Sequence, residues 1–112
     1  MSASVRIEAE AVRSLAFGSI GAAYAAVGTA ISNAARIILI QNLTDESLMF
    51  SLDGATDNFP LPSNGFLLLD LTANKTIDTG FFLAEGRTLY VKEIGNPTTG
   101  SVYFTSLYAE SI

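Results

Sequence analysis

Residues 36–54, RIILIQNLTDESLMFSLDG, carry the strongest β signal in the chain. The apolar, β-branched run RIILIQN is followed by a polar turn, TDES, and then by the segment LMFSL. A period of two places Leu48, Phe50 and Leu52 on one face, which is typical of a strand with one buried side. The dipeptide DG predicts a second turn, because glycine adopts positive φ at little cost. The stretch therefore predicts two successive strands joined by short turns.

Further short strands are expected on both sides of this stretch. In VRIEAEAV, residues 5–12, apolar and charged side chains alternate, although Val5, Ala9 and Val12 also have the spacing of a helix face. FLLLDL, residues 66–71, is the kind of short apolar run expected for a strand buried on both faces. The segments GFFLAEG, TLYVKEI and SVYFTSLYA each predict a strand in the second half of the chain.

The intervening segments carry the signals of turns and loops. ATDNFPLPSNG is assigned to a loop, because its prolines lack the N–H that a central strand needs. About eight short strands with Gly, Pro, Asn and Asp between them indicate an all-β fold, an antiparallel β-sandwich or jelly roll. A length of 112 residues predicts one domain, residues 1–112.

Residues 14–35, SLAFGSIGAAYAAVGTAISNAA, contain no charge and are long enough to cross a bilayer as a helix. The abundance of Ala and Gly disfavours both membrane insertion and a stable helix. Strands with a bend at Gly18 and Gly21 are favoured, with Leu15 and Phe17 continuing the phase of the first strand. A buried helix, or an extended N-terminal arm formed by residues 1–33, stays open.

Composition limits the classes of function. Hydrophobic residues make up 49% of the chain and charged residues 15%, so a small core leaves apolar surface for a partner. The net charge is −5 and the six Lys and Arg residues are scattered, which disfavours nucleic acid and anionic membranes. The chain has no Cys and no His, so thiolate and imidazole chemistry is excluded. The acidic N-terminal segment is unlike a signal peptide and predicts cytoplasmic synthesis.

Two acidic motifs raise the question of catalysis or metal binding. Asp78 begins the tripeptide DTG of aspartic proteases, but it lies late in the chain and two phenylalanines follow the motif, so a turn explains it better. Asp53, Asp57 and Asn58 offer oxygen ligands for a hard cation, but without EF-hand spacing, so a polar loop is favoured. We therefore expect no catalytic, cofactor-binding or metal-binding residues.

Five of the aromatic residues in the last third of the chain could stack against a glycan. No Trp and few basic residues accompany them, so packing within the sheets is favoured. The five are Phe81, Phe82, Tyr90, Tyr103 and Tyr108.

Residues 35–109 resemble the small virion structural proteins of tailed bacteriophages. The resemblance lies in the order of ARIILIQNLTDESLMFSLDGATDNFPLPSNGFLLLDLTAN, GFFLAEGRTLYVKEIG and PTTGSVYFTSLYA. It implies a β-sandwich subunit of a virion and carries no catalytic residues. Capsid decoration (cement) proteins, head–tail connectors and tail-associated rings all fit the pattern.

These observations together predict a non-enzymatic capsid decoration subunit. Its expected partners are the major capsid protein or other virion proteins, with self-association and without direct nucleic-acid or membrane contact. A head–tail connector or tail-associated ring protein and a glycan-binding module are the alternatives.

Overall fold

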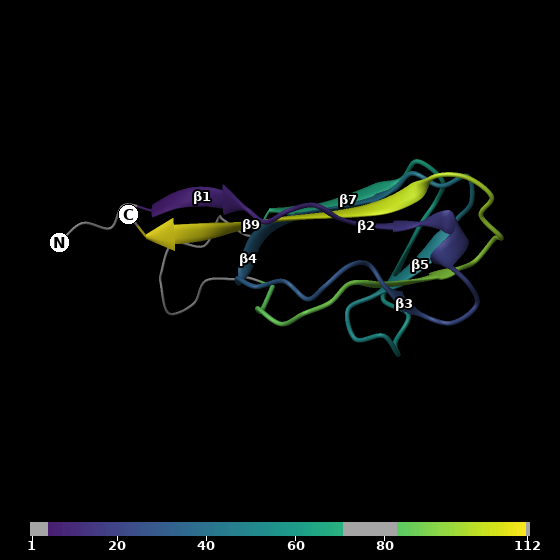
Figure 1. Ribbon diagram of the computed structural model, residues 1–112, viewed down its shortest axis with the longest axis horizontal. Helices are drawn as coiled ribbons and strands as arrows, with labels where there is room; N and C mark the ends of the chain where they lie inside the picture. Colours follow the sequence, from purple (N-terminus) through teal and green to yellow (C-terminus); the bar gives the residue numbers. More distant parts are fainter. Residues whose placement is uncertain (1–4, 71–82, 112) are drawn as a thin grey trace.

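The computed structural model describes residues 5–70 and 83–111, whose strands form two antiparallel sheets that face one another (Figure 1). The first sheet has the order β1-β9-β4-β7, and β2 also pairs with β9; the second has the order β3-β8-β5-β6. The all-β sandwich predicted from the sequence is confirmed. The strands are β1 (Val5–Ala9), β2 (Arg13–Ala16), β3 (Ala25–Ala26), β4 (Ala35–Asn42), β5 (Leu48–Ser51), β6 (Phe59–Leu61), β7 (Phe66–Asp70), β8 (Tyr90–Glu93) and β9 (Ser101–Ser111).

The core lies between the sheets and is built largely from alternate residues of their central strands. In β4, Ile38 and Ile40 are buried, whereas Ile37 and Leu39 are half-buried on the other face. Phe50 of β5 stacks on Phe59, with ring centroids 5.4 Å apart. The buried apolar residues are Ile20, Val27, Ile31, Ala35, Ile38, Ile40, Leu48, Phe50, Leu61, Leu89, Val91, Val102 and Phe104.

Residues 14–35 are built into the sandwich and do not form a detached arm. Ile20, Val27 and Ile31 belong to the core, and the Val27 N–H donates to the Leu89 carbonyl at 2.7 Å. A 3-10 turn directly after β2 supplies the expected bend, and no longer helix forms in this segment. The expected strands form only in part, as β2 and the two-residue β3, and most of residues 20–34 is irregular chain. Within residues 5–70 and 83–111, no helix is long and apolar enough to cross a membrane.

The edges of the two sheets differ from the sequence expectations. β7, expected to be buried on both faces, is an edge strand beside β4 and leaves Phe66 64% and Leu68 54% exposed. β6 forms where a loop was expected; it contains Pro60, and an edge position tolerates the missing N–H. The strand expected in GFFLAEG lies partly outside the described residues, and its Leu83 forms a single bridge to Ala35.

A fully buried Asn42 joins the β4–β5 turn to the chain that follows β6. Its Nδ2 donates to the carbonyls of Glu46, Leu61 and Pro62 at 2.9, 3.0 and 3.1 Å. Its Oδ1 accepts from the N–H and the hydroxyl of Thr44. The amide is satisfied on both sides, which is what allows a polar side chain to be buried without a large penalty.

Phe104→Ala should lower the free energy of unfolding by about 3–5 kcal/mol, because it opens a cavity between the sheets. Phe66→Ala removes the same side chain from the exposed outer face and should change that free energy by less than about 0.5 kcal/mol. Urea unfolding of both variants provides the measurement. Equal losses would contradict the assignment of the two faces.

Candidate functional site

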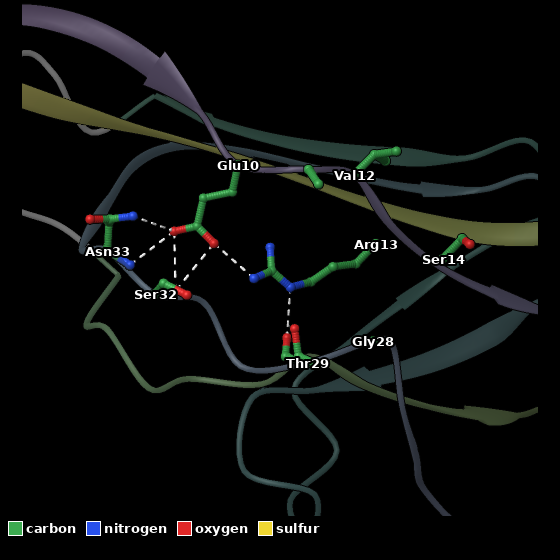
Figure 2. A pocket seen from close by; sticks show the side chains of 9 residues that line it. Glu10, Val12, Arg13, Ser14, Gly28, Thr29, Ser32 and Asn33 are labelled. Carbon is green, nitrogen blue, oxygen red and sulfur yellow. Dashed lines mark hydrogen bonds and ion pairs between the residues drawn. The ribbon is translucent and has the colours of Figure 1, made fainter.

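The outer face of the first sheet carries apolar side chains from several strands, exposed in β7 and half-buried in β4 and β9. Because Ile38 and Ile40 of β4 point into the core, Leu39 points outward, directly opposite Leu68 of β7 and Thr105 of β9. Val12 is 59% exposed, and Figure 2 shows it pointing away from the side to which Arg13 turns. We call this surface the outer apolar face; it comprises Val12, Ile37, Leu39, Phe66, Leu68, Tyr103 and Leu107.

The outer apolar face continues onto a two-stranded ribbon at one end of the molecule. β4 begins opposite Tyr108, so the last residues of β9 pair only with β1 among the described strands. We call β1 together with residues 107–111 of β9 the ribbon. Leu107 and Tyr108 also pair with β4, and beyond them the ribbon extends from the sandwich on the left of Figure 1. Ile7 lies opposite Ala109 and Ala9 opposite Leu107, so this side of the ribbon is apolar.

The other side of the ribbon is charged. Arg6 lies opposite Glu110, to which its Nη2 donates at 2.7 Å, and its Nε lies 2.9 Å from Glu8. All three side chains are substantially exposed, so these ion pairs contribute little to the stability of the fold. They place positive and negative charges next to one another on this side of the ribbon.

The outer face of the second sheet carries a small polar cluster around Lys92 of β8. The Tyr24 hydroxyl donates to Asp57 at 2.5 Å, and Lys92 lies 2.9 Å from the same carboxylate and 4.8 Å from the Tyr24 ring centroid. Burial and the neighbouring Asp57 raise the pKa of Tyr24 to about 12. The hydrogen bond from Tyr24 and the Lys92 ammonium lower the pKa of Asp57. The three side chains of this cluster thus bind one another.

A β-bulge between β1 and β2 separates the ribbon from the sandwich. Ala9 lies opposite Leu107 and Arg13 opposite Phe104, so three intervening residues face two on β9. The extra residue shifts the phase of the strand by one, which turns Glu10 and Arg13 toward the same inner side (Figure 2). The expectation that Leu15 continues the phase of Ile7 is therefore wrong.

Glu10 is held in this bulge by several donors. Its carboxylate lies 2.7 Å from Arg13 Nη2, and only 9% of the Glu10 side chain is exposed. It also accepts from the N–H of Ser32 and from the N–H and Nδ2 of Asn33 (Figure 2). Burial alone would raise the pKa of Glu10, but the hydrogen bonds from Arg13, Asn33 and Ser32 outweigh it and lower the pKa.

Arg13 connects the bulge to the chain that approaches the core residue Ile31. It donates to the carbonyls of Thr29 at 2.7 Å and Ala30 at 3.0 Å, while its Nη1 is buried without a hydrogen-bond partner in the described structure. Gly28, with φ +72°, packs against the aliphatic part of this side chain. An open groove surrounds these groups, lined by Glu10, Ala11, Val12, Arg13, Ser14, Gly28, Thr29, Ser32 and Asn33.

The side chains that line the groove bind one another and the backbone of residues 29–33. Both oxygens of Glu10 accept hydrogen bonds, from Arg13, Ser32 and Asn33. The sequence interpretation did not single out Glu10 and Arg13. The signal was the adjacent apolar pair Ala11-Val12, which breaks the strict alternation of residues 5–10.

The acidic residues considered for a cation are each engaged separately. Asp53 accepts from the N–H groups of Thr56 and Ala55 and from the Ser51 hydroxyl, which hold its pKa well below the usual range. Asn58 Oδ1 accepts the Leu52 N–H at 2.8 Å. No group of three or more His, Cys, Asp or Glu side chains placed to hold a metal occurs in the described part of the chain.

The aromatic residues considered for glycan stacking are not brought together. Tyr90 belongs to the second sheet, whereas Tyr103 lies on the outer apolar face of the first. Tyr108 lies opposite Glu8, on the charged side of the ribbon. Phe81, Phe82 and the DTG motif of residues 78–80 lie outside the described residues.

Comparison with known proteins adds no relative: no family model, no curated protein and no solved structure matches the chain.

Gly28→Ala should lower the free energy of unfolding by about 2 kcal/mol, because the residue has positive φ and the new Cβ would lie 2.8 Å from Arg13 Cβ. Gly18→Ala is the matched control; its Cβ would meet nothing within 4 Å, and we expect a change below about 0.5 kcal/mol. Thermal and urea unfolding compare the two. A neutral Gly28→Ala would refute the close packing of Arg13.

Glu10→Gln should lower the free energy of unfolding by about 3 kcal/mol near neutral pH, because Arg13 stays buried without its counter-charge. The folded-state pKa of Glu10 is below its ordinary value of 4.5, so its stabilisation is present above that pH. It is lost as the pH falls through the folded-state pKa, and the difference between variant and unmodified chain should shrink there. Glu8→Gln, on the exposed side of the ribbon, serves as control; a pH-independent difference for Glu10→Gln would contradict the argument.

Proposed function

We propose that the chain is a non-enzymatic structural protein of a virion and joins a larger protein assembly through the outer apolar face. The observation that supports this proposal is that face itself, with Phe66 64%, Val12 59% and Leu68 54% exposed on one side of the sandwich. Burial of apolar surface is the main favourable contribution to most protein association. An exposed apolar surface on a small domain is typical of a protein interface.

Within the virion, the role we favour is capsid decoration, with the major capsid protein as partner. The resemblance of residues 35–109 to small phage virion proteins supports this choice. A decoration subunit that buries its outer apolar face against the shell would resist lateral separation of the shell subunits. Many weak contacts on one lattice add up to firm attachment.

The arrangement of charged groups supports a role without catalysis. Glu10 and Arg13 bind one another and neighbouring backbone groups. Asp53 accepts hydrogen bonds from its own turn, and Asp57 binds Tyr24 and Lys92. Each of these groups has a structural role that explains its position.

Leu68→Glu should reduce the copy number of the protein in purified virus particles by at least about tenfold, because it places a charge in the middle of the proposed contact. Ile94→Glu is the matched control, since Ile94 is 55% exposed but follows β8 of the second sheet. Quantitative mass spectrometry of particles provides the copy number, and thermal unfolding checks that both variants fold.

The copy number of the unmodified chain separates the possible places in the particle. A number comparable to that of the major capsid protein supports decoration. A number that fits one small ring would instead support a head–tail connector or tail-associated ring. Normal incorporation of Leu68→Glu, or absence of the unmodified chain from particles, would refute the proposed role of the outer apolar face.

A further inference from the structure

The ribbon presents an open strand edge. Among the strands that the structure describes, β1 is the last at its side of the first sheet, and its five residues contain no proline. A regular edge strand offers unpaired N–H and C=O groups to any strand that can align with it. A two-stranded ribbon is also marginally stable in water by itself, so a third strand would stabilise it.

The backbone of β1 is oriented so that alternate residues face this edge. The Glu10 N–H donates to the Ser106 carbonyl at 3.1 Å, which directs the polar backbone groups of Glu10 toward β9. In an antiparallel pair the same direction recurs every second residue, so Glu8 and Arg6 also face β9. The N–H and C=O groups of Ile7 and Ala9 therefore point outward, to the open edge.

The charges of β1 make this edge complementary to itself. The strand has the sequence VRIEA, with Arg6 and Glu8 placed symmetrically about Ile7. When two such strands run antiparallel with Ile7 opposite Ile7, each Arg6 lies opposite a Glu8 of the other copy. Opposite charges facing one another across strands stabilise a sheet, and like charges destabilise it.

We infer that the chain forms a two-fold symmetric dimer in which the β1 edges of two copies pair antiparallel, centred on Ile7. The occupant of the edge is therefore a second copy of this chain. On the charged side, Arg6 of one copy lies between Glu110 of the same copy and Glu8 of the second copy. The charge therefore alternates in sign across these three strands. On the other side, the two Ile7 side chains meet and connect the outer apolar faces of both copies.

The other sheet edges fit this role less well. β3 has two residues, and β6 has three with a proline among them. β7 has five residues, FLLLD, but no pair of opposite charges that would select an antiparallel register. Among residues 5–70 and 83–111, the ribbon is the part that projects beyond the sandwich, so two ribbons can pair without contact between the two sandwiches (Figure 1).

The dimer is a property of the isolated chain and does not rest on the proposed role in a virion. Sedimentation of the purified chain up to millimolar concentration should therefore show a reversible monomer–dimer equilibrium. A chain that stays monomeric over this range would overturn the inference. A dimer combined with absence from particles would refute only the proposed function.

Charge reversal tests the register. Arg6→Glu places Glu opposite Glu, and Glu8→Arg places Arg opposite Arg, so each variant alone should have a dimer dissociation constant raised by about tenfold or more. An equimolar mixture restores both opposite-charge pairs, and it should form a one-to-one heterodimer about as tight as the unmodified dimer. Either variant dimerising as tightly as the unmodified chain, or a mixture that does not associate, would overturn the register.

Disulfide cross-linking tests the centre of the interface, because the chain has no cysteine of its own. In the proposed register the two Ile7 Cα atoms lie about 5.5 Å apart, within the range that a disulfide bridges. Ile7→Cys should therefore give a covalent dimer on mild oxidation. Val12→Cys is the control: Val12 is as exposed as Ile7, but its two copies would lie on the order of 30 Å apart. Cross-linking by Val12→Cys and not by Ile7→Cys would place the contact elsewhere and refute the inference.

Discussion

The β-bulge between β1 and β2, held by the ion pair of Glu10 and Arg13, is the constraint on which the arrangement of the molecule depends. β9 is eleven residues long and pairs with two strands in succession, β1 and β2. Without the bulge, the alternation of side chains would continue unbroken from β1 to β2. Ile7 and Leu15 would then lie on the same face of the sheet, although Ile7 belongs to the outer face and Leu15 packs against the core. The extra residue lets the same chain present an apolar side outward in the ribbon and an apolar side inward in the sandwich.

The ion pair also explains how a chain so rich in Ala and Gly is fixed against the first sheet. Residues 28–33 offer few large side chains, and Arg13 and Glu10 bind their backbone directly through the Thr29 and Ala30 carbonyls and the Ser32 and Asn33 N–H groups. Backbone recognition of this kind needs a small residue at the point of closest approach, which Gly28 supplies. The segment can then deliver Val27 and Ile31 to the core. Additional hydrogen bonds of this kind offset the cost of burying the two charges, although Arg13 Nη1 has no partner among the described residues.

The sequence predicted the class of fold and several strands, but not the details that create the surfaces. Period-two alternation identified β1, β5, β8 and β9. In β5, β8 and β9 the alternation marks one buried side, whereas in β1 it separates the apolar side of the ribbon from its charged side. It failed for FLLLDL, since a run of apolar residues has the same composition whether a strand is covered on both sides or exposed at an edge. Alternation also gave no sign of the hydrogen bonds that Glu10 accepts from Ser32 and Asn33, because these residues lie about twenty positions away in the sequence. The buried hydrogen bonds of Asn42 could not be predicted for the same reason, because their acceptors lie in two separate parts of the chain.

The two surfaces inferred for this chain support one another physically. Pairing of the β1 edges would extend the first sheet across two copies, and the outer apolar faces would then form one continuous surface. Each copy would meet its partner over a short edge, so the dimer in solution should be weak, as small interfaces are. A second contact through the outer apolar face would make the edge pairing effectively intramolecular, which greatly raises its occupancy without any new interaction. Weak pairing in solution and firm attachment on an ordered lattice are therefore compatible properties of the same subunit.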